Sequence, residues 1–537
     1  LIDPLGVQAF IYQTQYWTPS EQNANLVPLD GWFLANRIMW SVVALIALAV
    51  TYMKFSFTTS EVKKARKPIF QPETITIFKE SPFRRLPVLQ RTTGFGTTLR
   101  LVADRSVFYF NLIRKDTAFL AIVLSGLMLL VVKAMTMSEM YGSSSYPTTD
   151  SVLTLLGSFN LFFLLIAVVY PGDLIWKERQ LNIAGITDSL PVADYLDTLS
   201  KFFGLLLTYL VLLAALNLGG LGIQASKGYF DFEFSAYIGK LYGENFANLA
   251  LITIVAFFIQ VVVNNKLLGY VVCIVFFLLN GNLSKLGVES GLYQFAAGSL
   301  GPFSDMNKYG HFVTLFAWLK IYWLGIAGLF FIMAILFSIR GNETHPWVRY
   351  KAGLTKISTP VLVTSTLLSI SVVFSAGTIY YNTNLINDYE SGIEHKEMLS
   401  AYVKELKKYE NVPQPTIVEN SLHLALYPST REFVAEGFYY LKNLHMAPIS
   451  EIHVSHHLAR DLHVSYLQFD RKSYAVDSID DRFKYEIYRL EDALQPGDSL
   501  KMLFKLSYVT EGFRANDQNT DLIFNGTFID NGYFPSL

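Results

Sequence analysis

Charged residues gather where one long apolar stretch of the chain ends. They are Asp173, Lys177, Glu178 and Arg179, and three apolar residues follow at helical spacing, Ile183, Ile186 and Leu190. This pattern predicts an amphipathic helix from Lys177 to Leu190. Between two membrane helices, such a rigid element can pass the movement of an attached protein on to those helices. The alternative is that Lys177 to Arg179 form only the basic flank of a membrane helix.

Residues for catalysis or metal binding are not evident in the sequence. It contains no Gly-x-x-x-x-Gly-Lys-Ser/Thr loop for nucleotide phosphates and no His-Glu-x-x-His pair for zinc. The single cysteine, Cys273, rules out an intrachain disulfide. Zinc needs three or four converging ligands, so we do not assign a metal to the four neighbouring histidines His453, His456, His457 and His463. We therefore predict no catalytic, cofactor or metal site in this chain.

The composition is that of a membrane protein. Of the 537 residues, 52% are hydrophobic and only 16% are charged, and the net charge of −1 gives no basic surface for nucleic acid. A bilayer core needs about 20 apolar residues per helix, and about eight segments approach this length. They run from Ile38 to Phe57, Thr117 to Lys133, Val152 to Trp176, Phe202 to Ile223, Leu249 to Val263, Leu267 to Asn280, Lys320 to Ile339 and, interrupted by Thr and Ser, Thr359 to Tyr381.

Basic residues predict which ends of these spans face the cytoplasm. The loop after the first span is strongly basic, with Lys63, Lys64, Arg66, Lys67, Arg84, Arg85, Arg91, Arg100, Arg105, Arg114 and Lys115. The later loops on the same side carry Lys177, Arg179, Lys201, Lys266, Arg340, Arg349, Lys351 and Lys356, whereas residues 136–151 include no Lys or Arg. An even number of spans places the tail from Asn382 onward outside the cytoplasm.

Two further patterns concern the membrane border. Apolar residues recur at helical spacing between Thr98 and Ile113, which predicts an interfacial helix, although a solvated basic linker is the alternative. The set Phe33, Arg37, Ile38 and Trp40 recurs as Phe316, Lys320, Ile321 and Trp323. Basic and aromatic residues commonly anchor helices at a membrane border, so Arg37, Trp40, Lys320 and Trp323 are candidate anchors. The repeat also suggests two related halves of a transporter.

Beyond Pro413 and Pro415 the hydrophobic period changes to two, which indicates a β-rich soluble domain. The alternating segments are Ser421 to Tyr427, Phe433 to Leu441, Glu451 to Val454, Leu462 to Phe469, Phe483 to Tyr488, Ser499 to Thr510 and Leu522 to Ile529. The predicted fold class is therefore an α-helical polytopic membrane domain followed by an all-β extracytoplasmic domain, a sandwich or saddle that folds independently of the membrane part.

The region around the charged cluster resembles the coupling region of ABC-2 type transporter permeases. The resemblance rests on Asp173, Trp176, Lys177 to Arg179, a following small residue, Leu190-Pro191 and Lys201. The opening segment is similar to the outer loop of the same family, with Asp3-Pro-Leu-Gly, Tyr16-Trp-Thr-Pro, Glu21, Asn23 and Asn36 to Trp40. The β-rich part resembles the N-terminal domain of M1 aminopeptidases, in the run Leu422 to Gly437 and in Asn525 to Asn531 with Pro535.

This resemblance implies a fusion of an ABC-2 permease to an M1-type module, of which the chain is expected to be a fragment. Residues 1–57 would end the first permease half, 58–116 would form a basic cytoplasmic linker with the interfacial helix, 117–381 the second half, 382–415 a linker and 416–537 part of the β domain. It further implies a bacterial inner-membrane location, a separate ABC ATPase subunit that binds ATP, and a peptide substrate and zinc in a further, downstream domain.

Two other functions remain open at this stage. The chain could be the membrane anchor and first domain of a zinc aminopeptidase, or a scaffold that presents the β domain to partners. An anchor needs one span rather than eight, which favours transport. We expect no peptidase activity from these residues themselves, because peptide hydrolysis needs a metal-bound water and a general base.

Overall fold

The computed structural model describes most of the chain. The described residues are 3, 6–54, 94–137, 139–140, 143–144, 146–189, 193–338, 345–387, 389–456, 458, 462–476, 481–515, 522–524, 526–527 and 529–537. The basic residues predicted between Lys63 and Arg91, and also Leu190, Arg340 and His457, lie outside them.

The chain forms two compact units, which we describe separately. The first takes Leu1–Leu101 and Ala121–Tyr146. It contains α1 (Val7–Thr14), α2 (Pro19–Ala24), α3 (Gly31–Lys54), the start of α4 (Phe95–Arg114), most of α5 (Thr117–Thr136) and the short pair β1 (Glu139–Met140) and β2 (Ser143–Ser144). The second takes Val102–Leu120 and Pro147–Leu537, and it holds both a helical bundle and the β domain.

Seven of the described helical segments are long and apolar enough to cross a membrane, so the chain is a multi-pass membrane protein. They are Gly31–Met53, Thr117–Met135, Thr149–Gln180, Tyr195–Ser226, Phe234–Val263, Phe312–Phe337 and Thr359–Ile386. The weaker eighth predicted span, Thr359 to Tyr381, is among these seven. The sixth predicted span, Leu267 to Asn280, is shorter than they are, because its helix α12 (Lys266–Asn282) has only 17 residues.

The bundle of the second unit is built around α11 (Phe246–Val263), which packs against α7 (Asn160–Gln180), α9 (Asp194–Ser226), α12 and α13 (Phe312–Phe337). Asn264 ends α11 in the left-handed conformation with φ 53°, and the Asn265 side chain then accepts a hydrogen bond from Leu268 N and starts α12. The remaining helical elements of the bundle are α6 (Thr149–Leu156), η1 (Gly157–Phe159), α8 (Ala184–Asp188), α10 (Phe234–Tyr237), η2 (Ile238–Asn245), η3 (Ser284–Leu286), α14 (Pro346–Thr355) and α15 (Thr359–Tyr380).

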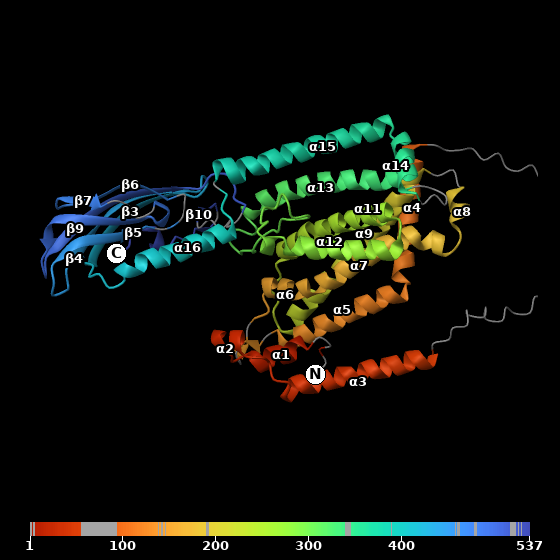
Figure 1. Cartoon of the computed structure of the whole chain (residues 1–537), viewed down its shortest axis with the longest axis horizontal. Helices are drawn as coiled ribbons and strands as arrows, with labels where there is room; N and C mark the ends of the chain where they lie inside the picture. Colours follow the sequence, from red (N-terminus) through yellow and green to blue (C-terminus); the bar gives the residue numbers. More distant parts are fainter. Residues whose placement is uncertain are drawn as a thin grey trace, which may run out of the picture. The chain divides into compact units, whose positions relative to one another are not determined.

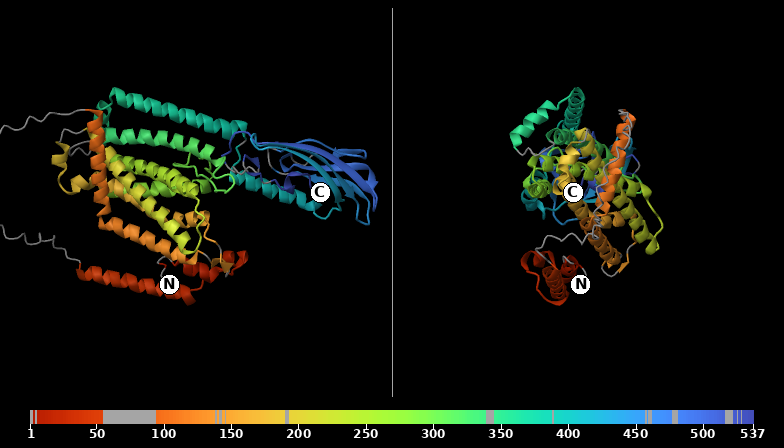
Figure 2. Two further views of the ribbon diagram at one scale, coloured as in Figure 1. Left: turned by 180° about the vertical axis from the view of Figure 1, so that it is seen from behind. Right: turned by 90° about the vertical axis from the view of Figure 1, so that its right-hand side faces the viewer.

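The helix predicted between Thr98 and Ile113 is present as α4, and it crosses the ends of α7 and α9 instead of running beside them (Figure 1 and Figure 2). Its apolar face is closed against α9 at Gly204, where an added Cβ would lie 2.9 Å from Ser106 O and 3.3 Å from Phe110 N. A glycine is therefore required for this close approach of two backbones. Figure 1 shows α8 and the β domain at opposite ends of the bundle.

A linker joins α15 to the β domain. It consists of η4 (Tyr381–Ile386), α16 (Gly392–Leu406) and η5 (Lys407–Tyr409). A capping box begins α16, because Glu394 N donates to Ser391 Oγ at 3.2 Å and Ser391 N donates to Glu394 Oε2 at 2.9 Å.

Replacing Ser391 with alanine is expected to weaken the first turn of α16 by about 0.5–2 kcal/mol, since one N-terminal amide loses its acceptor. Hydrogen exchange of residues 392–396 measures this opening. Ser400→Ala is the matched control, because Ser400 is exposed in the same helix and makes no capping contact. Equal exchange in the two variants would contradict the capping role.

The β domain has two main antiparallel sheets that share one apolar core, and a small antiparallel pair, β10 with β11. The four-stranded sheet has the order β3-β4-β9-β6 and the three-stranded sheet the order β5-β8-β7. The strands are β3 (Thr416–Tyr427), β4 (Glu432–Lys442), β5 (Ile449–Ser455), β6 (Leu462–Phe469), β7 (Ser473–Val476), β8 (Tyr485–Leu494), β9 (Ser499–Val509), β10 (Leu522–Ile523) and β11 (Gly526–Thr527), with the turns η6 (Asp481–Phe483) and η7 (Asn531–Tyr533). Phe433, Met502 and Phe504 of the first sheet meet Ile452, Val454 and Leu494 of the second.

Candidate functional site

The predicted charged residues lie at the end of α7, but they do not begin a separate amphipathic helix. The prediction of one helix from Lys177 to Leu190 was wrong: α7 continues to Gln180, and the chain then turns at Asn182, whose φ is 56°. A positive φ interrupts a right-handed helix. Only the five residues of α8 resume it, and Leu190 is outside the described residues.

Glu178 belongs to a cluster of ion pairs that joins three helices. Lys201 Nζ of α9 lies 3.2 Å from Glu178 Oε1 of α7 and 2.6 Å from Asp197 Oδ2 of α9. From α4, Tyr109 donates its hydroxyl hydrogen bond to Asp197 Oδ1 at 2.8 Å, and Arg105 Nη1 lies 3.4 Å from the same oxygen. The Lys201 side chain is only 6% exposed. We call these five residues the α4–α7–α9 cluster.

The other side of α7 is tied to the turn between α11 and α12. Lys266 Nζ lies 2.5 Å from Asp173 Oδ1, and Tyr270 donates to the same oxygen at 3.3 Å. Arg179 Nη1 donates to Asn264 Oδ1 at 3.5 Å, and its guanidinium lies 5.1 Å from the ring centre of Trp176. The end of α7 is therefore held from both sides.

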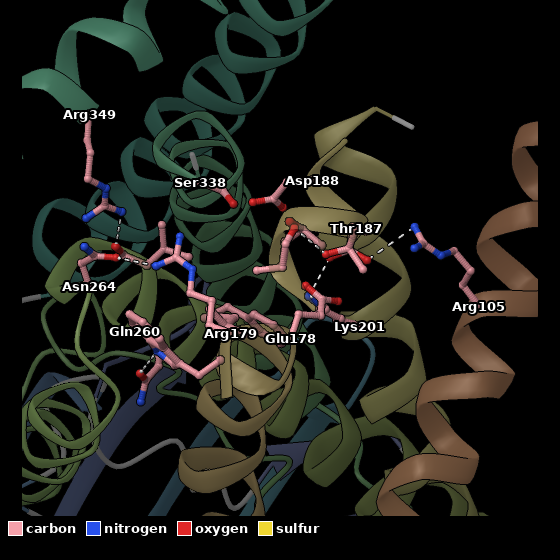
Figure 3. A pocket seen from close by; sticks show the side chains of 17 residues that line it. Arg105, Glu178, Arg179, Thr187, Asp188, Lys201, Gln260, Asn264, Ser338 and Arg349 are labelled. Atoms are coloured by element: carbon pink, nitrogen blue, oxygen red, sulfur yellow. Dashed lines mark hydrogen bonds and ion pairs between the residues drawn. The ribbon is translucent and has the colours of Figure 1, made fainter. Parts of the chain in front are cut away.

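A cavity of about 120 Å³ opens between these contacts (Figure 3). Arg349 of α14 lines it and is buried, with Nη2 donating to Val261 O at 2.6 Å and to Phe337 O at 3.0 Å. Burial, and then the charge of Arg179, lower the pKa of Arg349. Gln260 of α11 forms part of the wall and accepts a hydrogen bond from Trp176 Nε1 at 3.3 Å.

Apolar side chains of the segment after α7 face outward. Leu181 is 57% exposed, Ile183 39% and Ile186 69%. Lys177 is half-buried. Exposed aliphatic residues beside a charged cluster can bind another protein.

The repeated residues at the membrane border share one geometry in both copies. The Arg37 guanidinium carbon lies 4.9 Å from the ring centre of Phe33, and Lys320 Nζ lies 5.2 Å from that of Phe316. In the second copy the role extends beyond an anchor, because Lys320 is buried and donates to Ala296 O and Ala297 O at 2.9 and 3.0 Å.

Trp323 makes the same kind of contact as Lys320, since its Nε1 donates to Gly291 O at 3.1 Å. Lys320 and Trp323 thus fasten the loop that precedes α13 to that helix. In the first copy, Asn36 next to Arg37 donates to Asp3 O at 2.8 Å. In both copies, helix residues thus hold an earlier segment of the chain.

Sequence reasoning missed Tyr109, Asp197, Asn264 and Gln260, and it counted Arg105 and Arg349 only as basic loop residues. Among the described residues, no group of three or more His, Cys, Asp or Glu side chains could hold a metal ion.

Comparison of the chain with protein-family models, with curated proteins and with solved structures finds no match in any of the three.

Proposed function

We propose that the chain is the permease part of an ABC-2 type transporter, driven by a separate ATPase that binds where α8 lies. The observation that carries this proposal is the α4–α7–α9 cluster beside the exposed residues of α8. Because Lys201 pairs with both Glu178 and Asp197, a partner that moves α8 acts on α7 and α9 together. The fixed turn at Asn264 extends the same movement to α11 and α12.

The ATP-hydrolysing subunit is a separate partner on this proposal. The sequence has no Walker A loop for nucleotide phosphates, so ATP would bind to that subunit. Its side of the membrane would be the cytoplasm, in keeping with the basic residues Lys177, Arg179 and Lys266 near this end. The membrane would be the bacterial inner membrane.

With the short apolar helix α12 as an eighth crossing, the β domain would then be an extracytoplasmic M1-like module. Its position at the end of the bundle opposite α8 supports this arrangement (Figure 1). The second candidate function is that of a membrane-anchored zinc aminopeptidase with its catalytic residues in a further domain. In favour of it, the M1-like run Leu422 to Gly437 forms one regular hairpin, in which Leu422 pairs with Gly437.

A substitution on α8 tests the transport proposal more cleanly than charge reversal at Glu178, which would also break the ion-pair cluster. Ile186→Glu places a charge on a side chain that is 69% exposed, so the fold should be unaffected. Vanadate-sensitive ATP hydrolysis that co-purifies with the chain from its native membranes is expected to fall about tenfold, a loss of roughly 1.4 kcal/mol of binding.

Leu286→Glu is the matched control, because Leu286 is also 69% exposed and lies in η3, away from α8. It should leave the co-purifying ATP hydrolysis unchanged. Equal hydrolysis in the two variants and the wild type would contradict an ATPase docking site on α8. Zinc-dependent aminopeptidase activity of the native protein, without ATP hydrolysis, would instead favour the second candidate.

A further inference from the structure

Two buried histidines lie at the end of β5, and three of their four ring nitrogens have no hydrogen-bond partner among the described residues. The side chains of His453 and His456 are each 3% exposed. Within the part of the chain that the structure describes, these three nitrogens are His453 Nε2 and both ring nitrogens of His456. Buried polar atoms are nearly always hydrogen-bonded, so these exceptions require an explanation.

His453 lies between the linker and the three-stranded sheet. Its Nδ1 is 2.9 Å from the hydroxyl oxygen of Tyr485 in β8, and its ring centre is 4.9 Å from that of Tyr409 in η5. Tyr409 also stacks on Tyr485, with ring centres 6.1 Å apart. From the segment before β3, Gln414 Oε1 accepts a hydrogen bond from His453 N at 2.8 Å. The imidazole is thus part of the contact that holds the linker to the sheet.

Burial, and not the neighbouring charge, disfavours the protonated form of His453. Glu451 Oε2 of β5 lies 3.9 Å from Nε2, but Glu451 already accepts hydrogen bonds from Arg489 of β8, with Nε at 3.0 Å from Oε1. From η5, Lys408 lies over the Tyr409 ring at 5.0 Å and adds positive charge. Burial lowers the pKa of His453, and Glu451 opposes this effect only in part.

His456 lies beside a carboxylate of β8. Its Nε2 lies 3.5 Å from Glu486 Oε2 of β8, and Tyr488 of the same strand donates to Glu486. The His456 ring beside it is the largest cause of the lowered pKa of Glu486. The charged group of Lys484 is directed elsewhere, because its Nζ donates to Leu462 O at 3.1 Å.

We propose that His453 is an acid-sensitive latch, whose neutral imidazole holds α16 and η5 on the sheet β5-β8-β7 and whose protonation releases them. The contact surface also includes Tyr402 of α16, whose ring centre lies 5.7 Å from that of Phe483. Release would free the β domain from the segment that ties it to α15. The latch does not depend on the transport proposal.

The lowered pKa of His453 decides in which direction pH changes the stability of the latched contact. The unfolded or released segment takes up the proton first, at the ordinary histidine pKa of about 6.5. Stability from the latch is therefore complete above pH 6.5 and is lost as the pH falls below that value. Between neutral pH and pH 5 the ratio of released to latched protein rises at most about thirtyfold. The reason is that at pH 5 His453 is protonated in the released form and neutral in the latched form.

The experiment is hydrogen exchange of residues 392–409 in the full chain in nanodiscs at pH 7.5 and 5.0, corrected for intrinsic exchange. The opening constant in the wild type is expected to rise about tenfold or more at pH 5.0, within the thirtyfold limit. His453→Gln, which cannot titrate, should abolish the rise, and the control His456→Gln should keep it. An opening constant independent of pH, or an equal rise in His453→Gln, would overturn the latch.

A measurement on the wild type keeps the proposal testable if a variant does not fold. Exchange of the imidazole C2 hydrogen, followed by mass spectrometry, gives the pKa of His453 directly. A value below about 6.5 agrees with the latch. A value at or above 6.5 would overturn it, because protonation would then not favour release.

Discussion

Replacing Lys201 with methionine is expected to destabilise the bundle by about 3–5 kcal/mol, the usual cost of removing one partner from a buried ion pair. Lys201 is the cation that contacts both Glu178 and Asp197, and its side chain is 6% exposed. Without it, Arg105 contacts Asp197 from one side at 3.4 Å, and Glu178 keeps only the Tyr109 hydroxyl at 3.4 Å.

Thermal melting of the purified protein in detergent measures this loss. Lys285→Met is the control, since Lys285 is exposed in η3 and its replacement should leave the melting temperature nearly unchanged. Adding Glu178→Gln and Asp197→Asn to Lys201→Met removes the unpaired charges and should recover much of the stability. Melting of Lys201→Met at the same temperature as the Lys285 control would show that the cluster does not stabilise the bundle.

The same cluster explains why the sequence predicted the helices better than their ends. The span predicted from Phe202 to Ile223 is part of α9, which begins eight residues earlier at Asp194. Hydropathy excludes Asp197 and Lys201 from a membrane helix, because each alone is costly to bury. Their pairing with each other and with α4 and α7 removes that cost, and such pairing is visible only in the folded protein.

The β domain was more predictable, because alternation of apolar and polar residues depends on neighbours in sequence. The hairpin of β3 and β4 and the long strand β9 agree with their predicted segments. Strand β7 (Ser473–Val476) was missed, since four residues are too few to show a period of two. Of the candidate site, the sequence predicted only the charged residues on α7. Tyr109, Asn264 and Arg349 come to the site from distant parts of the chain, so their sequence neighbours do not indicate this role.

Replacing Gly204 with alanine is expected to push α4 away from α9 at a cost of about 1–3 kcal/mol, the usual penalty for overpacking. The added Cβ would lie 2.8 Å from Tyr109 Cβ and 2.9 Å from Ser106 O. Backbone atoms cannot rotate away as a flexible side chain can, so the helix itself must shift. Tyr109 would then lose its 2.8 Å hydrogen bond to Asp197.

The matched control is Gly219→Ala in the same helix, because no atom lies within 4 Å of its added Cβ. This change should leave the protein as stable as before or up to about 1 kcal/mol more stable, since alanine favours a helix over glycine. Thermal melting separates the two variants. A Gly204 variant that melts with the Gly219 variant would contradict the close packing of α4 on α9.

On the transport proposal, the Gly204 variant should also distinguish binding of the ATPase from transmission of its movement. Gly204 lies inside the contact of α4 with α9 and does not reach the exposed residues of α8. Association of the ATPase should therefore persist, while ATP-driven transport falls because Tyr109 no longer connects α4 to α9. Transport at the wild-type rate in a variant with displaced α4 would show that α4 takes no part in transmission.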